Sequence, residues 1–308
     1  MILTVTLNAA LDITYRVPRL RPHGTNRITE VSERPGGKGL NVARVLSALG
    51  HRTVATGFAG GGTGDALRAL LADTDVTDAL VPVGGATRRT VAVVDESTGD
   101  TTQLNEPGPT VSPAEWDAFL GTYRELLAGA RAVALCGSLP PGVPVDVYAR
   151  LTRAARTAGV PVLLDTSGEP LRRGLAARPD LAKPNADELA ALTGSTEPLR
   201  AARDARRRGA HAVAASLGPE GMLAVTADGA WQAAPPRRFA GNPTGAGDSA
   251  VAGLLSGLVE DLPWPDRLTR AVALSAATVR APAAGEFDPS TYEELLPGVV
   301  VTDHPAVA

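Results

Sequence analysis

Cysteine and histidine are scarce in this chain of 308 residues. Cys136 is the only cysteine, so an internal disulfide cannot form and thiol chemistry is not expected. The histidines are His23, His51, His211 and His304. Their wide separation lacks the spacing of metal ligands, so zinc chemistry is not expected either.

Long apolar runs are also absent from the sequence. No stretch reaches the roughly 20 consecutive apolar residues that span a bilayer. The first residues, MILTVTLNAALD, lack the basic leader of a secretory signal. We therefore expect a cytoplasmic protein without a membrane partner.

Neither sign of charge dominates, because 30 basic and 33 acidic residues give a formal net charge of −3. Both signs are mixed along the chain, so no continuous positive stripe is predicted and nucleic acid is not an expected partner. With 44% hydrophobic and 20% charged residues, the composition is that of a globular protein. The length suits one large α/β domain or two small ones.

Lysine is scarce too, since only Lys38 and Lys183 occur among the 30 basic residues. A compact ammonium is not interchangeable with a planar guanidinium where a small anion must be held in a tight space. Lys38 stands in a glycine-rich turn, and Lys183 stands at a strand end before a proline. Either lysine alone could have been retained by chance in an arginine-rich sequence. The surroundings of both lysines nevertheless predict two anion-binding positions.

The chain does contain strand patterns that alternate with helix patterns. Apolar, β-rich runs recur near residues 5, 55, 134, 163 and 214. In segment 42–49 the apolar residues fall at i, i+3, i+4 and i+7, and Gly50 follows as a stop signal, which predicts an amphipathic helix. Such alternation predicts a mainly parallel sheet covered on both faces, with ligands bound at the carboxyl ends of the strands.

Two segments break this alternation, at about residues 12–35 and 86–105. The second reads as two strands joined by a turn at 97–100. Because charged and apolar residues partly alternate there, we expect a small antiparallel lid that rises from the edge of the sheet. We expect residues 1–308 to form a single domain that carries this lid.

The strongest motif is GNPTGAGDS at residues 241–249, which leads into a helix pattern. Free amides at such an N-terminus bind phosphate oxygens, and Gly245 and Gly247 let the backbone approach closely. Asp248 is unusual in an anion site unless it accepts a proton from an incoming nucleophile. A helix cap is the alternative role for this residue.

A second glycine-rich turn, PGGKGLNVARVL at residues 35–46, places Lys38 and Asn41 on one helix face. It lacks the spacing of a Walker A loop. The turn GFAGGGTGD at 57–65 misses the dinucleotide fingerprint, which argues against a dehydrogenase. An ordinary basic residue in a turn is the alternative for Lys38.

The third motif is LAKPNADEL at residues 181–189, in which Lys183 ends a strand and Asn185 and Glu188 open a helix. The alternative to a functional role is a helix capping box, although the first place usually holds Ser or Thr. SLGPEG at 216–221 forms a tight turn suited to a nucleotide, and Asp165 also stands at a strand end.

Together these segments resemble the PfkB-type, ribokinase-like carbohydrate kinases, in the branch that contains 1-phosphofructokinase and tagatose-6-phosphate kinase. The likeness runs from TLNAALD at residue 6 to Gly285, and GGKG, CGSLPPG, KPNADEL, SLGPEG and NPTGAGD follow the family's order. The resemblance implies a three-layer αβα sandwich with a mainly parallel central sheet and a small β lid. It also implies ATP with Mg²⁺ and transfer to a phosphorylated ketohexose.

The same resemblance assigns roles to individual residues. Asp248 looks like the catalytic base, and the anion hole would consist of Gly245, Ala246 and Gly247. The nucleotide side would consist of Lys183, Asn185, Glu188, Ser216, Gly218 and Gly221. Mg²⁺ would be held through the ATP phosphates, organised by Asn185 and Glu188, with Asp165 as a further candidate. The sugar-phosphate side would consist of Asp12, Gly37, Lys38, Asn41, Arg88 and Ser138.

The choice of substrate is less defined than the reaction. Thr90 and Ala92 stand where 1-phosphofructokinases usually carry Asn and Lys, which leaves fructose 1-phosphate and tagatose 6-phosphate open. A 6-phosphofructokinase, a kinase of an unphosphorylated sugar and a non-catalytic sugar-phosphate sensor are the alternatives. Apolar residues that alternate on the lid predict a homodimer joined through the lids. Asn26 or Arg27 would then reach the neighbouring site.

Overall fold

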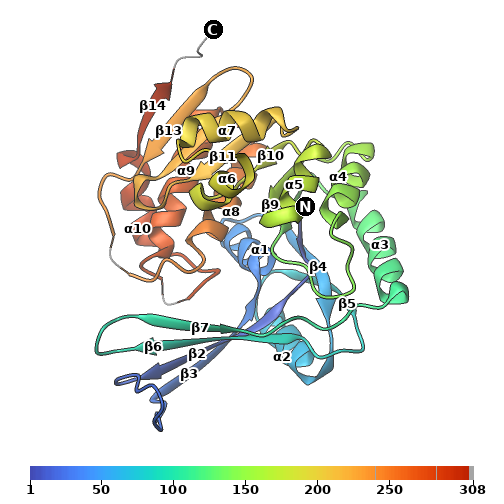
Figure 1. Ribbon diagram of the computed structural model, residues 1–308, viewed down its shortest axis with the longest axis vertical. Coiled ribbons are helices and arrows are strands. Elements are labelled where there is room, and N and C mark those ends of the chain that lie inside the picture. Colours follow the sequence, from blue (N-terminus) through green and yellow to red (C-terminus); the bar gives the residue numbers. More distant parts are fainter. Residues whose placement is uncertain (240, 282, 305–308) are drawn as a thin grey trace.

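A ten-stranded sheet forms the centre of the computed structural model, which describes residues 1–239, 241–281 and 283–304 (Figure 1). In spatial order its strands are β14 (Val300–His304), β13 (Ala230–Ala234), β12 (Met222–Val225), β11 (Ala212–Ser216), β10 (Leu181–Ala182), β9 (Val162–Asp165), β8 (Ala132–Cys136), β1 (Ile2–Thr6), β4 (Thr53–Ala59) and β5 (Thr77–Pro82). The strands from β11 to β5 are parallel, and β12 to β14 extend that edge in antiparallel fashion. The expected mainly parallel sheet is confirmed.

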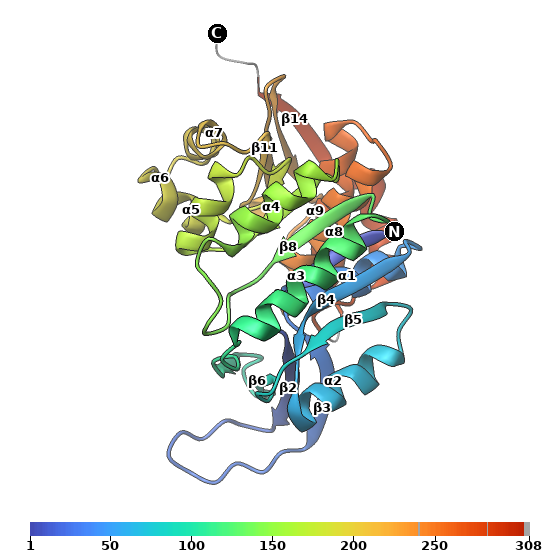
Figure 2. The ribbon, with the colours of Figure 1, turned by 90° about the vertical axis from the view of Figure 1, so that its right-hand side faces the viewer.

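Helices cover both faces of this sheet (Figure 2). One face carries α3 (Pro113–Leu127), α4 (Val147–Thr157), α5 (Gly168–Ala176), α6 (Ala186–Thr193) and α7 (Pro198–Arg207). The other carries α1 (Lys38–Ala48), α2 (Gly61–Ala72), α8 (Ala246–Val259), α9 (Trp264–Thr278) and α10 (Pro289–Leu295). Short 3₁₀ turns are η1 (Gly218–Glu220) and η2 (Leu296–Gly298). In the described ranges, no helix is long and apolar enough to cross a membrane.

The two faces are built from alternate residues of the same strands. Leu3 and Val5 of β1 pack toward α3 and α4, whereas Ile2 packs toward α1 and α8. This alternation follows from the period of two along a strand, and it makes the central strands apolar on both sides. Helix α1 spans the predicted amphipathic segment, and Gly50 follows its end with φ 85°.

A second, four-stranded sheet extends from the carboxyl edge of the main sheet and is called the lid here (Figure 1). Its strands in order are β3 (Glu30–Gly36), β2 (Ala10–Val17), β6 (Arg88–Asp95) and β7 (Thr101–Asn105). The expectation of a fully antiparallel lid is wrong, because β2 and β6 pair in parallel. Both strands follow parallel strands of the main sheet, β1 and β5, so they leave it in the same direction.

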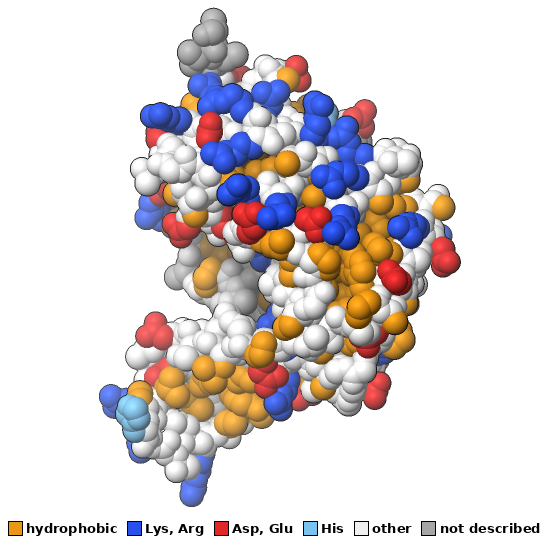
Figure 3. All heavy atoms as spheres, turned by 45° about the vertical axis from the view of Figure 1, so that its right-hand side comes forward, with side chains coloured by type: hydrophobic (Ala, Val, Ile, Leu, Met, Phe, Trp, Pro, Cys, Tyr) orange, Lys and Arg blue, Asp and Glu red, His pale blue; other side chains and the backbone are white. Residues whose placement is uncertain are grey.

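The register of the lid separates an apolar face from a polar one. Tyr15 lies between Val31 and Val93, and Ile13 lies beside Val91, so these side chains share one face. Figure 3 shows apolar side chains gathered on the lid. Of the residues on this face, Val31 is 54% exposed and Leu104 is 59% exposed. The opposite face carries Asp12, Arg34 and Thr90 in one row at the base of the lid.

Candidate active site

The predicted functional side chains gather where strands of the main sheet end. Asp165 is the last residue of β9, Lys183 follows β10, and Ser216 ends β11. Ser138 follows β8 by two residues, and Lys38 is the first residue of α1, directly after lid strand β3. Because the carboxyl ends of parallel strands meet at one edge, residues far apart in sequence become neighbours here.

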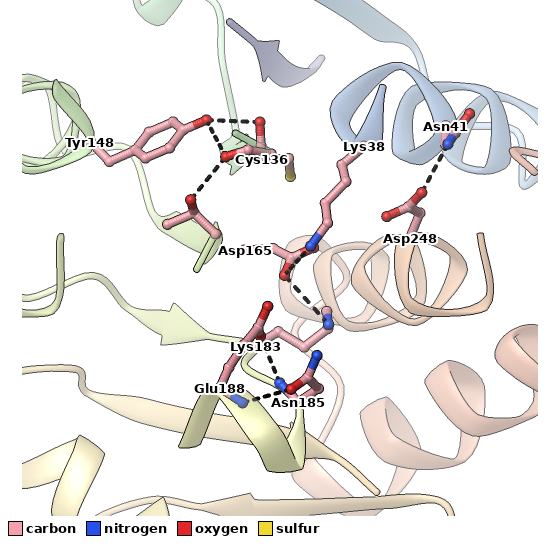
Figure 4. Close-up of polar contacts among 11 residues, drawn as sticks. Lys38, Asn41, Cys136, Tyr148, Asp165, Lys183, Asn185, Glu188 and Asp248 are labelled. Atoms are coloured by element: carbon pink, nitrogen blue, oxygen red, sulfur yellow. Dashed lines mark hydrogen bonds and ion pairs between the residues drawn. The ribbon is translucent and has the colours of Figure 1, made fainter. Parts of the chain in front are cut away.

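Both lysines of the chain converge on a single buried carboxylate (Figure 4). Lys38 Nζ lies 3.3 Å from both carboxylate oxygens of Asp165, and Lys183 Nζ lies 3.5 Å from Asp165 Oδ1. Asp165 is 1% exposed and Lys183 is 4% exposed. Burial alone would lower the pKa of Lys38, but the carboxylates of Asp165 and Asp248 raise it above its ordinary value. The centre of the site is therefore a positively charged pair organised by one acid.

The GNPTGAGDS turn opens α8, as its glycines predict. Gly245 has φ 85°, and a Cβ there would lie 2.8 Å from the backbone of Ala284, so only glycine fits this position. The Ala246 amide donates to the Pro243 carbonyl at 3.1 Å. A Cβ on Gly247 would lie 3.7 Å from Lys183 Nζ, which places a lysine ammonium beside the N-terminus of the helix. The Ala246 amide thus has a partner within the turn, and a lysine ammonium lies beside Gly247 in the first turn of α8.

Asp248 does not cap α8, whose N-cap is Gly245 without a side-chain bond. Instead, its Oδ2 accepts a hydrogen bond of 2.9 Å from Asn41 Nδ2 on α1 (Figure 4). The carboxyl is buried, and this burial, helped by the negative charge of Asp165, raises the pKa of Asp248 to about 6. Such a carboxyl is mostly ionised at neutral pH yet takes up a proton readily, which suits a general base.

A second carboxyl with a shifted pKa, the half-buried Asp12, lies at the base of the lid. Burial raises the pKa of Asp12 to about 6, although the positive charge of Arg88 opposes the shift. Gly36 packs against this carboxyl so closely that a Cβ would lie 2.0 Å from Asp12 Cγ. Gly37, the next residue, has φ 102° and precedes Lys38 at the start of α1.

Asn8 connects Arg88 with Ser138, and the sequence analysis missed this residue. Arg88 Nε donates to the Asn8 carbonyl at 3.1 Å, and Asn8 Nδ2 donates to Ser138 Oγ at 3.1 Å. Asn8 follows β1 by two residues, so the rule that selected the other strand-end residues could have selected it. Arg88 and Lys38 face different partners, since Arg88 interacts with Asp12 and Glu106 whereas Lys38 interacts with Asp165 and Asp248.

Asn185 and Glu188 form the capping box of α6. Glu188 N donates to Asn185 Oδ1 at 2.8 Å, and Asn185 N donates to Glu188 Oε2 at 2.9 Å. The capping interpretation is thus confirmed for these two side chains, and a role at the nucleotide phosphates stays a prediction. Within the described ranges, no three His, Cys, Asp or Glu residues cluster to hold a metal ion.

A cavity of about 760 Å³ adjoins this capping box and the N-terminus of α8. Its walls include Asn185, Ser216, Gly218, Gly221, Ala246 and Gly247, all predicted from the motifs. Val272, Ser275, Ala276 and Val279 complete one wall. The sequence offered no motif for this last group, because it has only the apolar spacing of an ordinary core helix.

The two lid residues predicted to reach a neighbouring subunit lie in the loop between β2 and β3. Asn26 Oδ1 accepts from the Arg21 amide at 2.8 Å, and Asn26 Nδ2 donates back to the Arg21 carbonyl at 3.0 Å. The Asn26 side chain therefore holds its own loop in shape. Arg27 is exposed at the surface of the lid.

A helix N-terminus, two lysines and a buried carboxyl lie together at the carboxyl edge of this αβα sandwich, and such an arrangement suits a phosphotransferase. Residues 5–291 match the family described as "pfkB family carbohydrate kinase". The chain belongs to this family, and its fold is the ribokinase-like fold that the sequence resemblance implied.

Relatives over nearly the whole length agree with this assignment. The 1-phosphofructokinase of Rhodobacter capsulatus is 42% identical over 283 residues, which cover 89% of this chain and 90% of that protein. The phosphofructokinase-2 of Escherichia coli in complex with substrates and products has a TM-score of 0.88 and 31% identity, covering 96% and 98% of the two chains. A "Possible 1-phosphofructokinase" of Thermotoga maritima has a TM-score of 0.90 and 28% identity, covering 99% and 100%.

Proposed function

We propose that this protein transfers the γ-phosphoryl group of ATP to fructose 1-phosphate and produces fructose 1,6-bisphosphate. The observation that carries the proposal is the 42% identity with a 1-phosphofructokinase over 89% of the chain. The buried base and the paired lysines supply the chemistry that such a relative needs. The departures at Thr90 and Ala92 concern the sugar side alone, so they leave the transfer step unaffected.

The two ends of the site take different parts of the substrates in this proposal. Arg88, Asp12 and Ser138 bind the phosphosugar, because Asn8 holds Arg88 and Ser138 together at the base of the lid. Lys38 acts at the transferred phosphoryl group rather than at the sugar's own phosphate, since it lies beside Asp165 and Asp248. Lysine ammonium groups there offset negative charge that spreads over the phosphoryl oxygens during transfer.

Proton transfer is assigned to Asp248. Its carboxylate accepts the proton of the sugar hydroxyl, and Asn41 fixes its orientation through the bond to Oδ2. The N-terminal amides of α8 and Lys183 hold the phosphoryl group in line with that hydroxyl. No covalent bond to the protein is required.

The nucleotide fits the cavity of about 760 Å³ beside Ser216, Gly218 and the start of α8. When bound, ATP supplies the phosphoryl group, and Mg²⁺ supplies positive charge at its phosphates. Asn185 and Glu188 are the proposed organisers of the metal-bound phosphates, with Asp165 as a further candidate. The hydrogen bonds of the capping box already hold both side chains at the N-terminus of α6.

The test is ADP release measured in parallel with fructose 1-phosphate, tagatose 6-phosphate, fructose 6-phosphate and free fructose. The highest kcat/KM is expected with fructose 1-phosphate. A higher kcat/KM with either of the other phosphosugars would change the proposed substrate but would still support a kinase. ATP binding without ADP release for any of the four sugars would favour a sensor.

We also propose a homodimer in which the apolar faces of two lids meet. Ile13 and Tyr15 lie on this face together with the exposed Val31 and Leu104. A small sheet with such a face is marginal alone, and a two-fold pairing would bury it symmetrically. The Escherichia coli phosphofructokinase-2 has a tetrameric inhibited form, which shows that a relative of this fold self-associates.

A further inference from the structure

Glu286 lies between the lid and the body of the protein. Its Oε1 is 2.7 Å from Arg44 Nη2 on α1 and 3.1 Å from Arg34 Nε on lid strand β3. The Arg44 contact is a hydrogen-bonded ion pair, whereas the Arg34 N–H is not aligned for a hydrogen bond. The Glu286 side chain is 32% exposed, so one partly buried carboxylate joins the segment after α9 to lid strand β3 and to helix α1, which follow each other in the chain.

The segment that carries Glu286 also touches the catalytic machinery. Arg44 Nη1 donates to the Ala284 carbonyl at 3.0 Å. A Cβ on Gly245 would lie 2.8 Å from Ala284, and a Cβ on Gly285 would lie 2.9 Å from Asn41 Oδ1. Ala284 and Gly285 therefore pack directly against the residue that opens α8 and against the residue that orients Asp248.

The lid contacts the turn before α8 at another point. Gln103 Nε2 on β7 lies 3.5 Å from Thr244 Oγ1, the residue before Gly245. Arg34 pairs in register with Asp12, so a movement of the lid over the sugar also moves Arg34. Close packing transmits such a movement, because the segment at 284–285 has no free space toward Gly245 or Asn41.

We propose that Glu286 is a positioning residue that couples the lid to the N-terminus of α8. The proposal rests on the proposed kinase function and adds a specific connection to it. Sugar bound under the lid fixes Arg34, Arg34 fixes Glu286, and the 284–285 segment then holds Gly245 and Asn41 in place. Phosphoryl transfer thereby depends on a closed lid, although Glu286 itself touches no reacting group.

A kinetic comparison of single and double variants tests this coupling. Glu286→Gln and Arg34→Ala are each expected to lower kcat by roughly 10- to 100-fold, because a small displacement of the aligned groups is costly. KM for ATP is expected to change less than about twofold, since most of the wall of the nucleotide cavity lies outside the start of α8. The kcat of the double variant is expected to equal that of the less active single variant, because both changes remove the same connection.

Glu260→Gln is the matched control. Glu260 also bridges two basic side chains, Arg270 and His51, with 37% of its side chain exposed, and it lies at the opposite end of α8. It is expected to keep kcat near the wild-type value. Unchanged kcat in Glu286→Gln, an equal loss in Glu260→Gln, or additive losses in the double variant would each overturn the proposal.

Amide hydrogen exchange tests the same coupling without turnover. Added fructose 1-phosphate is expected to slow exchange in strand 30–36 and in segment 241–250 of the wild type. In Glu286→Gln, strand 30–36 should still be slowed and segment 241–250 should not. Equal slowing of segment 241–250 in both proteins, or no slowing there in the wild type, contradicts the coupling. Absent ADP release in the wild type would instead contradict the proposed function.

Discussion

The carboxyl edge of the main sheet and the lid differ in how firmly they hold their functional groups. At the edge, Asp165, Lys183 and Asp248 are 1%, 4% and 7% exposed, and each contacts a polar or charged partner. In the lid, the strands are largely half-buried or exposed, and Val31 and Leu104 are more than half exposed, at 54% and 59%. Rigid, water-poor surroundings strengthen electrostatic stabilisation, which phosphoryl transfer needs.

The lid meets a different requirement. In its proposed role the lid covers a substrate that must enter and leave. Within the described ranges its strands contribute no residue to the buried apolar clusters of the body, and helix α2 packs against β2 and β3. One property is nevertheless common to both regions, since burial raises the pKa of Asp12 and of Asp248 to about 6. The comparison therefore predicts that changes at the edge affect catalysis and changes in the lid affect recognition or assembly.

The largest effect is expected from Asp248→Asn, which removes the proposed base and keeps the shape of the side chain. kcat should fall by roughly 10²- to 10⁴-fold, because a positioned general base contributes about that much. ATP affinity, measured by calorimetry, should hardly change. Near-normal turnover together with a lower melting temperature would assign Asp248 a structural role and remove the contrast with the lid.

Arg88→Ala tests the expectation that a change at the lid affects recognition of the phosphosugar. Loss of a charge-assisted contact to the sugar's phosphate should cost about 1.5–3 kcal/mol, chiefly as a higher KM for the phosphosugar. KM for ATP should remain close to that of the wild type. Steady-state kinetics with both substrates varied measures the two effects.

Lys38→Met tests the carboxyl edge with the same kinetic measurements as Arg88→Ala. Because Lys38 faces Asp165 and Asp248, its loss should lower kcat more than it raises KM for the phosphosugar. If both variants raised only KM for the phosphosugar, then Lys38 would belong to the sugar phosphate, as the sequence resemblance implied.

The raised pKa of Asp248 also predicts a dependence of stability on pH. This carboxyl has a pKa of about 6 in the native protein and 3.8 as its ordinary value, so the native state binds more protons between these limits. Its contribution to stability is present below about pH 3.8 and is lost as pH rises to about 6. Asp248→Asn avoids the loss and should be more stable than the wild type at pH 7 by about 1–3 kcal/mol.

Urea unfolding at several pH values measures this difference. The gap between the two proteins should shrink as pH falls from 6 toward 4, because the wild-type carboxyl is already protonated in the native state there and begins to be protonated in the unfolded state as well. A constant gap across this range would show that Asp248 titrates normally in the native protein.

Much of the fold could be predicted because the sequence pattern and the tertiary structure agree. Apolar runs became β1, β4, β8, β9 and β11, and the periodic segment at 42–49 became the greater part of α1. The parallel pairing of β2 and β6 could not be predicted from either strand alone. It depends on the direction in which two distant strands leave the main sheet.

The candidate site likewise contains some residues that sequence motifs indicated and others that only the tertiary structure brings in. Glycine-rich turns and strand ends identified Lys38, Asp165 and Asp248, because these residue types are unusual in such positions. Glu286 carried no motif, since its role depends on a partner in the lid and another on α1. No sequence motif indicated the α9 wall of the proposed nucleotide cavity either, because its residues resemble those of any core helix.

The smallest effect on the folded monomer is expected from a charge on the apolar face of the lid. Leu104→Asp changes a residue that is 59% exposed and that lies beside Val91 of β6. In a monomer such a surface change should alter the free energy of unfolding by about 0.5 kcal/mol or less. In a lid-to-lid dimer it would bury an unpaired carboxylate, which costs several times more.

Sedimentation velocity at micromolar concentration should therefore show a dimer for the wild type and a monomer for the variant. Asp65→Asn is a fitting control, because it changes the charge of an exposed residue of helix α2, outside the lid sheet. A fully active wild-type monomer would contradict the dimer, and the exposed face of the lid would then need no partner.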